Sequence, residues 1–273
     1  MAIVTIFGGT FGDDEELARG VAKTLGCACV SREIFVAASH RCEVPEARLN
    51  EILEKEPHWW ERWQENLRPY RIALQAALSE AALGEDLVYH GHVGHGLLPG
   101  IRHVLRVLLT APMEFRIEQV RARQGLDARA ARRYIEQVEK ARTRRLMALF
   151  GTDWRDPGQY ALTLNMGQMR SAAAQAMIAR AALLEDYRPT AASREALGDL
   201  ALAAKVQAAL LPHPQLRNLI INVQAKQGEV TLSGVIPASV SEQDIRHIVE
   251  MVPGVNKVST DLVHVPSSAL RYG

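Results

Sequence analysis

Short apolar runs alternate with longer periodic stretches over the first 165 residues of the chain. Between the runs, apolar residues recur at three- and four-residue spacing, as Tyr134, Val138 and Ala141 do, which is typical of amphipathic helices. Apolar strands separated by helices predict an α/β domain whose parallel sheet is covered by helices on both faces. The five predicted strands are "AIVTIF" (2–7), "CACV" (27–30), "DLVYH" (86–90), "VLRVLLTA" (104–111) and "YALTLN" (160–165).

A helical insertion, residues 43–83, is predicted between the second and third strands. Pro57 and Pro69 are expected to break or kink it, because proline cannot donate a backbone hydrogen bond inside a helix. Trp59, Trp60 and Trp63 lie close together in this segment. We interpret them as a packing anchor, with base stacking on a ligand as the alternative.

A second unit follows Ala182, where the pattern becomes polar and contains Pro189. The elements after this point follow the order α-β-β-α-β, with a turn at Gln227 and Gly228 between the first two strands. The chain therefore predicts domains at 1–185 and 197–266, joined by a linker at 186–196.

Charge and composition narrow the range of partners and compartments. The formal net charge is +1, which argues against attraction of nucleic acid by the overall charge of the protein. We therefore expect no specific nucleic-acid partner. Three cysteines are too few, and odd in number, for a disulfide scaffold. No apolar stretch approaches the about 20 residues that cross a bilayer, and no leader-like segment opens the chain. We expect a cytoplasmic protein.

The C-terminal unit resembles the BON domain over residues 200–265. The resemblance is carried by "KVQAALL" (205–211), "NVQAKQGEVTLSGVI" (222–236) and "VPGVNKVSTDLVHV" (252–265). Gly228, Gly234 and Gly254 fall at turns, where glycine tolerates backbone conformations that other residues avoid. The resemblance implies a partner for this domain, either a protein or a phospholipid surface.

The N-terminal unit, from Ile3 to about Leu183, resembles the cytidylate kinase-like family, which has a P-loop fold. The resemblance is carried by "LARGVAKTLGCACVSREIF" (17–35), "VLRVLLTAPMEFRIEQVRARQGLDARAARRYIEQVEKARTRR" (104–145) and "GTDWRDPGQYALTLNM" (151–166). It implies a P-loop kinase-like parallel sheet and a nucleotide ligand with Mg²⁺. The activity it implies is phosphoryl transfer from ATP to a nucleoside monophosphate such as CMP.

Arginines are the candidate catalytic residues that this resemblance implies. In "EKAR", Arg142 matches the arginine on the family's lid helices that reaches the transferred phosphate, and Arg144 and Arg145 are further candidates. In "SREI", Arg32 matches an arginine near the acceptor, although Ser31 stands where the family has aspartate. A solvated, salt-bridged helix pair is an equally plausible reading of the arginine-rich helices.

The first glycine turn, residues 8–12, is the candidate phosphate site. Backbone N–H groups of a glycine turn and a helix start bind anions, and Gly8, Gly9, Thr10 and Gly12 can supply that geometry. The lysine of a P-loop is absent, and four acids follow instead: Asp13, Asp14, Glu15 and Glu16.

Those acids limit what the turn can bind. A carboxylate gains only about 0.3–1 kcal/mol from a helix dipole. The same group about 4 Å from a phosphate charge costs around 4 kcal/mol at an effective dielectric near 20. We favour the interpretation that the acids cap and solvate the helix start. The alternatives are that Asp13 and Asp14 point outward, or that one of them holds Mg²⁺.

The histidine-rich loop "HGHVGHG" is a second candidate site. His90, His92 and His95 are able in principle to ligate a metal, but glycine freedom would make such a site loose. We instead expect His92 near the cleft at the end of a strand, where it contacts an anion. It follows Gly91, where the family usually has Gly-Arg.

Three functions are consistent with these features. The departures at the lysine, Ser31 and His92 all weaken the same cleft, so we favour a pseudoenzyme: a nucleotide- or anion-binding module coupled to the BON domain. An active nucleoside monophosphate kinase is the first alternative, since arginines and Mg²⁺ are able to replace one lost charge. A scaffold with a vestigial cleft is the second.

Overall fold

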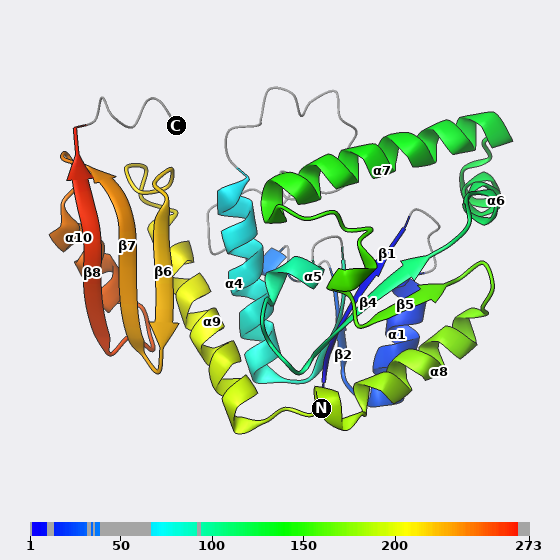
Figure 1. Ribbon diagram of the computed structural model, residues 1–273, viewed down its shortest axis with the longest axis horizontal. Helices are drawn as coiled ribbons and strands as arrows, with labels where there is room; N and C mark the ends of the chain where they lie inside the picture. Colours follow the sequence, from blue (N-terminus) through cyan, green and yellow to red (C-terminus); the bar gives the residue numbers. More distant parts are fainter. Residues whose placement is uncertain are drawn as a thin grey trace.

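The computed structural model describes residues 2–9, 14–31, 34, 36–38, 67–91 and 94–266 (Figure 1). Its larger sheet is parallel and has the strand order β2-β3-β1-β4-β5. The five predicted strands and the parallel α/β sheet are confirmed. Their bounds are β1 Ile3–Gly8, β2 Ala28–Val30, β3 Leu87–His90, β4 Val104–Thr110 and β5 Leu162–Asn165.

Helices cover both faces of this sheet because side chains alternate along its buried strands. On β1, Val4 and Ile6 face a core shared with α1 (Asp14–Leu25) and α8 (Ser171–Ala182). Ile3 and Phe7 face the opposite core, which receives the other helices. These are α4 (Arg68–Gly84), α5 (Gly94–Leu97), the end of α7 (Ala128–Phe150) and one face of α9 (Ala191–Leu210).

A helical hairpin of α6 (Met113–Gln124) and α7 extends from the carboxyl end of β4 (Figure 1). Helix α6 ends at Gly125, whose φ of 68° is the left-handed conformation that glycine adopts freely. Asp127 then caps α7 by accepting a hydrogen bond from the Ala130 N–H. The end of α6 and the start of α7 are thus set by the local sequence, a glycine followed by a capping aspartate.

The C-terminal domain folds as predicted, in the order α-β-β-α-β. Strands β6 and β7 are antiparallel, and β7 and β8 are parallel. Gln227 and Gly228 have φ values of 51° and 85° and form the predicted turn. The bounds of the elements after α9 are β6 Ile221–Lys226, β7 Glu229–Pro237, α10 Glu242–Glu250 and β8 Lys257–Val265.

Helix α9 begins earlier than the predicted linker allows. Thr190 and Ser193 form a reciprocal capping box, which fixes the helix start at Ala191. Residues 191–196 are therefore helical, and the expectation of a linker through 196 is wrong for this segment. The domain boundaries themselves stay a prediction.

Helix α9 belongs to two cores at once. Leu197, Ala204 and Ala208 contribute to the core of the larger sheet, whereas Val206 and Leu210 contribute to the core of the smaller one. Figure 1 shows α9 between α4 and β6. The two sheets are consequently joined through packed side chains rather than through chain connectivity alone.

A polar contact reinforces this junction. The Arg68 guanidinium, at the start of α4, donates hydrogen bonds to the carbonyls of Leu219 and Ile221. Pro69 lies in the first turn of α4, where its missing N–H costs nothing. Pro57 and the three insertion tryptophans lie outside the described residues. No helix in the described part of the chain is both long and apolar enough to cross a bilayer.

Candidate functional site

The candidate site lies at the carboxyl ends of β1 and β3. These strands are neighbours, with Ile6 opposite His90, and α1 starts at Asp14 shortly after β1 ends at Gly8. In open parallel sheets this edge is where ligands bind, at the point where the strand order reverses.

Asp14 points into this edge. A Cβ added to Gly8 would lie 2.4 Å from the Asp14 Oδ2 atom, so only glycine leaves room for this carboxylate. The other partner is His90, whose Nε2 lies 3.2 Å from the same oxygen. Both side chains are less than one-fifth exposed, at 19% for Asp14 and 18% for His90.

The charge of Asp14 is stabilised in place. Burial alone would raise the pKa of Asp14, but the hydrogen bond and the charge of His90 outweigh it and lower that pKa below 3.8. The interpretation that the acids solvate the helix start is therefore wrong for Asp14, because His90 offers a buried partner. It fits Glu15, which is exposed and pairs with Arg19. Asp13 lies outside the described residues.

Arg142 reaches the same edge from α7. Its Nη1 donates a 2.8 Å hydrogen bond to the Gly8 carbonyl, and its guanidinium carbon lies 5.4 Å from the Phe7 ring and 5.8 Å from the Trp154 ring. Burial lowers the pKa of Arg142, and the charge of Asp14 partly offsets this. A guanidinium titrates far above neutral pH, so the group is a buried cation facing the first glycine turn.

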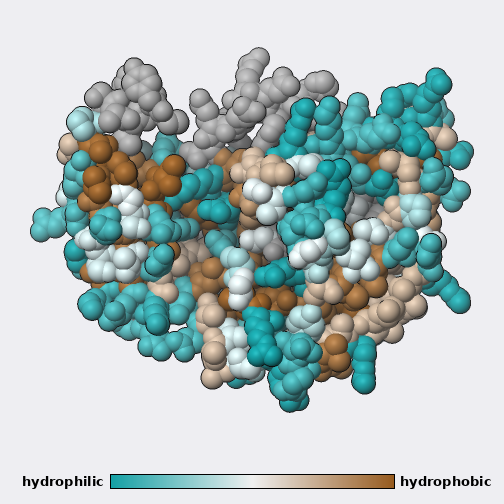
Figure 2. All heavy atoms as spheres, viewed as in Figure 1, coloured by the Kyte–Doolittle hydropathy of each residue, from teal (hydrophilic) through white to brown (hydrophobic). Residues whose placement is uncertain are grey.

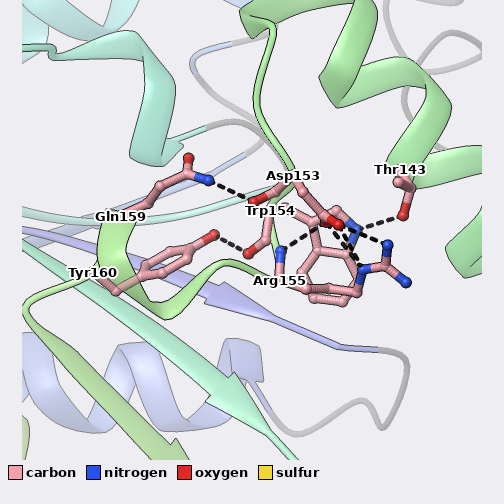
Figure 3. A network of polar contacts seen from close by, with 6 residues as sticks. All are labelled: Thr143, Asp153, Trp154, Arg155, Gln159 and Tyr160. Carbon is pink, nitrogen blue, oxygen red and sulfur yellow. Dashed lines mark hydrogen bonds and ion pairs between the residues drawn. The ribbon is translucent and has the colours of Figure 1, made fainter.

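The loop between α7 and β5 holds Trp154 in position (Figure 3). The indole Nε1 donates to the Thr143 hydroxyl at 3.0 Å, and the Tyr160 hydroxyl donates to the Trp154 carbonyl at 2.8 Å. The Trp154 ring packs 5.2 Å from the Phe7 ring. This network fixes the Trp154 ring, which together with the Phe7 ring packs against the Arg142 guanidinium. The sequence signal for this network is the "GTDWRDPGQY" stretch, although its pattern alone assigns no role to Trp154.

The neighbouring arginines of α7 differ in environment. Arg145 is buried, and burial together with the charge of Arg142 lowers its pKa to about 10. Arg144 is exposed. Arg116 on α6 forms an ion pair with Glu139 on α7, with both side chains mostly buried, and so ties the hairpin together. The alternative of a salt-bridged helix pair thus holds for Arg116, whereas Arg142 faces the sheet edge.

A cavity of about 430 Å³ opens beside Asp14. Its walls come from α1, the end of β4, the start of α6 and the segment that joins β5 to α8. Mixed apolar and polar walls of this kind are typical of sites for small organic ligands. The lining residues are Leu17, Leu109, Phe115, Met166 and Met169, with Asp14, Gly167, Gln168, Arg170 and Ser171 among them.

The structure brings together part of the predicted site. Gly8, Asp14 and Arg142 meet at one point, and His90, predicted only as a metal candidate, joins them. The Gly9 N–H is already used, since it donates to the Leu109 carbonyl at 3.3 Å. Four predicted site residues lie outside the described residues: Thr10, Gly12, Arg32 and His92.

The alternative of a histidine metal site gains no support from the described residues. Among the residues whose placement is described, no three His, Cys, Asp or Glu side chains gather as metal ligands would. His92, like the His95 side chain, is outside that set, and His90 is engaged by Asp14.

Comparisons with known proteins agree with both sequence resemblances. Residues 3–168 match the model of the cytidylate kinase-like family, and residues 198–266 match that of the BON domain. The predicted fold class, a P-loop kinase-like parallel sheet with a small separate domain, is thereby confirmed.

Two curated relatives each match a part of the chain. A cytidylate kinase of Methanopyrus kandleri is 34% identical over 94 residues, which are 32% of this chain and 49% of that protein. Osmotically-inducible protein Y of Escherichia coli is 36% identical over 69 residues, 25% of this chain and 34% of that protein. The chain therefore spans half or less of the length of these relatives.

Solved structures resemble the larger domain. An uncharacterized protein from Eubacterium ventriosum gives a TM-score of 0.50 at 16% identity, over 67% of this chain and 98% of that one. A shikimate kinase from Bacteroides thetaiotaomicron gives 0.42 at 11% identity, over 67% of this chain and 99% of its own. At such identities the first likeness concerns the fold alone.

Proposed function

The chain belongs to the cytidylate kinase-like family through residues 3–168, and from this premise we propose that it is a nucleotide- or anion-binding module that has lost phosphoryl transfer. The module spans residues 1–185 and is coupled to a BON interaction domain at 197–266 through residues 186–196, of which 191–196 form the start of α9. The proposed contacts to the ligand phosphates are Gly8, Gly9, Thr10, Gly12, His92 and Arg145, with Arg142 and Arg32 at the positions that are catalytic in active relatives.

One observation supports the loss of transfer: the two charged side chains described at the end of β1, Arg142 and Asp14, already have partners within the protein. Arg142 donates to the Gly8 carbonyl, and Asp14 lies against Gly8 with His90 as its partner. Phosphoryl transfer depends on cations that are free to neutralise the charge developing on the phosphate. A cation bound to a backbone carbonyl and offset by a carboxylate is poorly placed for that role.

The cavity beside Asp14 supports nucleotide binding. Its volume of about 430 Å³ and its Leu17, Phe115 and Met166 walls suit a planar base, while Gln168 and Arg170 offer polar contacts. Mg²⁺ usually keeps several waters and takes one or two carboxylates together with substrate phosphates. Asp14 would be one such carboxylate, and Mg²⁺ arriving with the nucleotide would offset the negative charge of its phosphates.

A nucleotide panel tests the proposal directly. Melting temperature is measured with millimolar CMP, CDP, ADP and ATP, with and without Mg²⁺, because a ligand of the native state raises stability. We expect a rise with at least one nucleotide and no conversion of CMP and ATP to CDP and ADP. Turnover that Arg142→Ala abolishes would establish the active kinase instead, and the absence of any shift would favour the scaffold.

The BON domain carries a feature that favours a protein partner. Ile220, Val235 and Val263 are 77%, 42% and 56% exposed. The strand register puts Ile221 opposite Gly234 and Val235 opposite Val263, so the three apolar side chains form a row on the outer sheet face. Figure 2 shows hydrophobic residues gathering over this end of the small domain.

The charges on that outer face are balanced. Lys226 and Lys257 are offset by Glu229 and Asp261, and Lys257 pairs with Glu229 at 3.3 Å. An anionic lipid surface is attracted by an excess of basic residues, which this face lacks. We therefore propose an apolar protein segment as the partner, rather than a phospholipid surface.

A further inference from the structure

The free edge of the small sheet is strand β8. The strand order β6-β7-β8 leaves β8 paired on one side only, whereas the edge formed by β6 packs against α9 (Figure 1). Helix α10 covers the inner face of the sheet through Ile245 and Val249. An edge strand presents unpaired N–H and C=O groups, which are able to pair with a strand of another chain.

Alternate residues of β8 direct their backbone groups toward β7. The Lys257 N–H donates to the Gly228 carbonyl at 3.4 Å, and the Val265 carbonyl accepts from the Ala238 N–H at 2.8 Å. Because these groups alternate along a strand, the residues between direct theirs to the free edge. These residues are Val258, Thr260, Leu262 and His264.

Arg246 on α10 closes one end of this edge. Its Nη1 donates a 2.8 Å hydrogen bond to the Val258 carbonyl, and its Nη2 donates to the Thr260 hydroxyl at 3.0 Å. Within the described residues, the outward backbone groups of Leu262 and His264 have no hydrogen-bond partner. The edge from Thr260 to His264 is therefore open to a further strand.

The outer sheet face beside this open edge carries one apolar and one acidic side chain. Val263 is exposed and belongs to the apolar row. Asp261 is exposed on the same face, and in the described part of the chain it has no ion-pair partner, since Lys257 is paired with Glu229 at 3.3 Å. An added strand would be complementary if it placed an apolar residue beside Val263 and a basic residue beside Asp261.

We propose that the open edge of β8 receives an extended segment of another protein as a further strand of the small sheet. Main-chain hydrogen bonds to Leu262 and His264 hold the segment. Side-chain pairs with Val263 and Asp261 select a segment that has an apolar and a basic residue two positions apart. The inference rests on the proposed protein partner of the apolar row and specifies how that partner is bound.

A second copy of this chain fits the open edge less well. Antiparallel pairing of two β8 strands around a two-fold axis matches residues whose backbone groups both face outward. Registers that keep the Arg246 hydrogen bond put Asp261 opposite another Asp261 or opposite a valine of the second copy. None of them brings a basic residue to the Asp261 carboxylate, so a different protein is the better partner.

N-methylation of a synthetic peptide tests strand addition without altering the protein. The probe is a fluorescein-labelled peptide of about seven residues that alternates valine with threonine and has arginine at one valine position. Its binding to the full chain is measured by fluorescence anisotropy. In an added strand only alternate N–H groups face β8, on the threonines if the peptide is antiparallel and on the valines and arginine if it is parallel.

We expect methylation of one alternate set to weaken binding at least about tenfold, because hydrogen bonds to β8 are lost. Methylation of the other set should change binding by less than about twofold, because those N–H groups face away from β8. Equal effects of the two sets would overturn the proposal. An unmethylated peptide that does not bind at millimolar concentration would overturn it as well.

A charge exchange tests the side-chain pair. Asp261→Lys should weaken binding of the arginine peptide at least about threefold, and a peptide with glutamate in place of arginine should recover the affinity. Glu250→Lys is the control, because it makes the same change of charge at an exposed position of α10 and should alter binding by less than about twofold. Equal effects of the two variants would contradict the predicted pair and overturn this mode of selection.

The outcomes separate strand addition from the proposed partner surface. If Val263→Lys abolishes peptide binding while the two methylated sets behave alike, the apolar row stands and strand addition is refuted. If one methylated set alone loses binding while Val263→Lys changes nothing, strand addition stands and the apolar row is refuted. A dimer of the unaltered chain that the peptide dissociates, seen by analytical ultracentrifugation, would identify a second copy as the occupant and overturn the proposal.

Discussion

Arg142 is the residue on which the candidate site is built. Its guanidinium contacts the end of β1 through the Gly8 carbonyl and lies over the rings of Phe7 and Trp154, which pack against each other. A buried cation held by these contacts affects the stability of the fold, and in the proposed function it also faces the ligand. The fold and the proposed ligand binding therefore involve the same side chain.

Removal of Arg142 should destabilise the protein strongly. Arg142→Ala leaves the buried Asp14 carboxylate with less compensation and the Gly8 carbonyl without its donor, and we expect a loss of about 3–5 kcal/mol in the free energy of unfolding. Urea denaturation measures it. Arg144→Ala is the control, since that neighbouring side chain is exposed and should change stability by less than about 0.5 kcal/mol. Equal effects of the two variants would contradict the account.

The direction of Asp14 is the part of the site that the sequence did not predict. A carboxylate at a helix start is usually solvated, and the partner that turns it inward, His90, lies on another strand and far away in sequence. Only the family resemblance singled out Arg142, because its helix is rich in arginine and the spacing alone favours none of them. Pairings between distant elements depend on tertiary packing, which local patterns do not encode.

At the scale of elements, α9 is the helix that links the two domains. Its face toward α4 carries the small residues Ala204 and Ala208, and the opposite side carries Val206 and Leu210. Small side chains let two helices approach closely, so this face tolerates little added volume.

Added volume on that face should therefore be costly. Ala204 is 2% exposed, and Ala204→Leu forces α9 away from its neighbours, with an expected loss of about 1–3 kcal/mol. Ala196→Leu introduces the same side chain at an exposed position of the same helix and should change stability by less than about 0.5 kcal/mol. Thermal or urea unfolding of both variants measures the difference, and an unchanged Ala204→Leu protein would contradict close packing here.

The strands were predictable because their apolar runs are short, β-rich and bounded by polar segments, as β1 and β4 illustrate. The start of α9 was not, since "RPTAASREALGD" is polar and contains proline, which is the pattern of a linker. The capping box at Thr190 and Ser193 was its only local signal, and serine in place of Glu or Gln at the third position disguised it. The role of α9 in two cores was equally hidden, because its alanine-rich sequence has no single apolar face.

At the scale of the whole molecule, one domain carries the proposed nucleotide or anion site and the other an exposed apolar row. These features lie on different sheets that α9 and Arg68 hold together. A partner bound to the apolar row of the small domain would therefore be held at a fixed position relative to the larger sheet.

The proposed partner surface predicts a selective loss of binding. Peptides selected on the full chain from a random library should be apolar, and Val263→Lys should weaken their binding at least about tenfold by placing a charge in the row. Gln224→Lys adds the same charge on the polar part of the same sheet face and should leave binding nearly unchanged. Sedimentation of the full chain with anionic vesicles, lost in Val263→Lys, would instead identify a lipid surface and contradict the protein partner.

The double membership of α9 restricts how this protein can be recombined with others. A chimera that exchanges the small domain at residue 190 would also exchange one wall of the kinase-like core, because Leu197, Ala204 and Ala208 would leave with it. A graft that begins after Leu211 would instead strip the BON sheet of Val206 and Leu210. A gene fusion that folds must therefore keep α9 together with an α4 and a β6 whose side chains fit its two faces. Substitutions in α4 and in β6 should consequently be accompanied by compensating substitutions in α9.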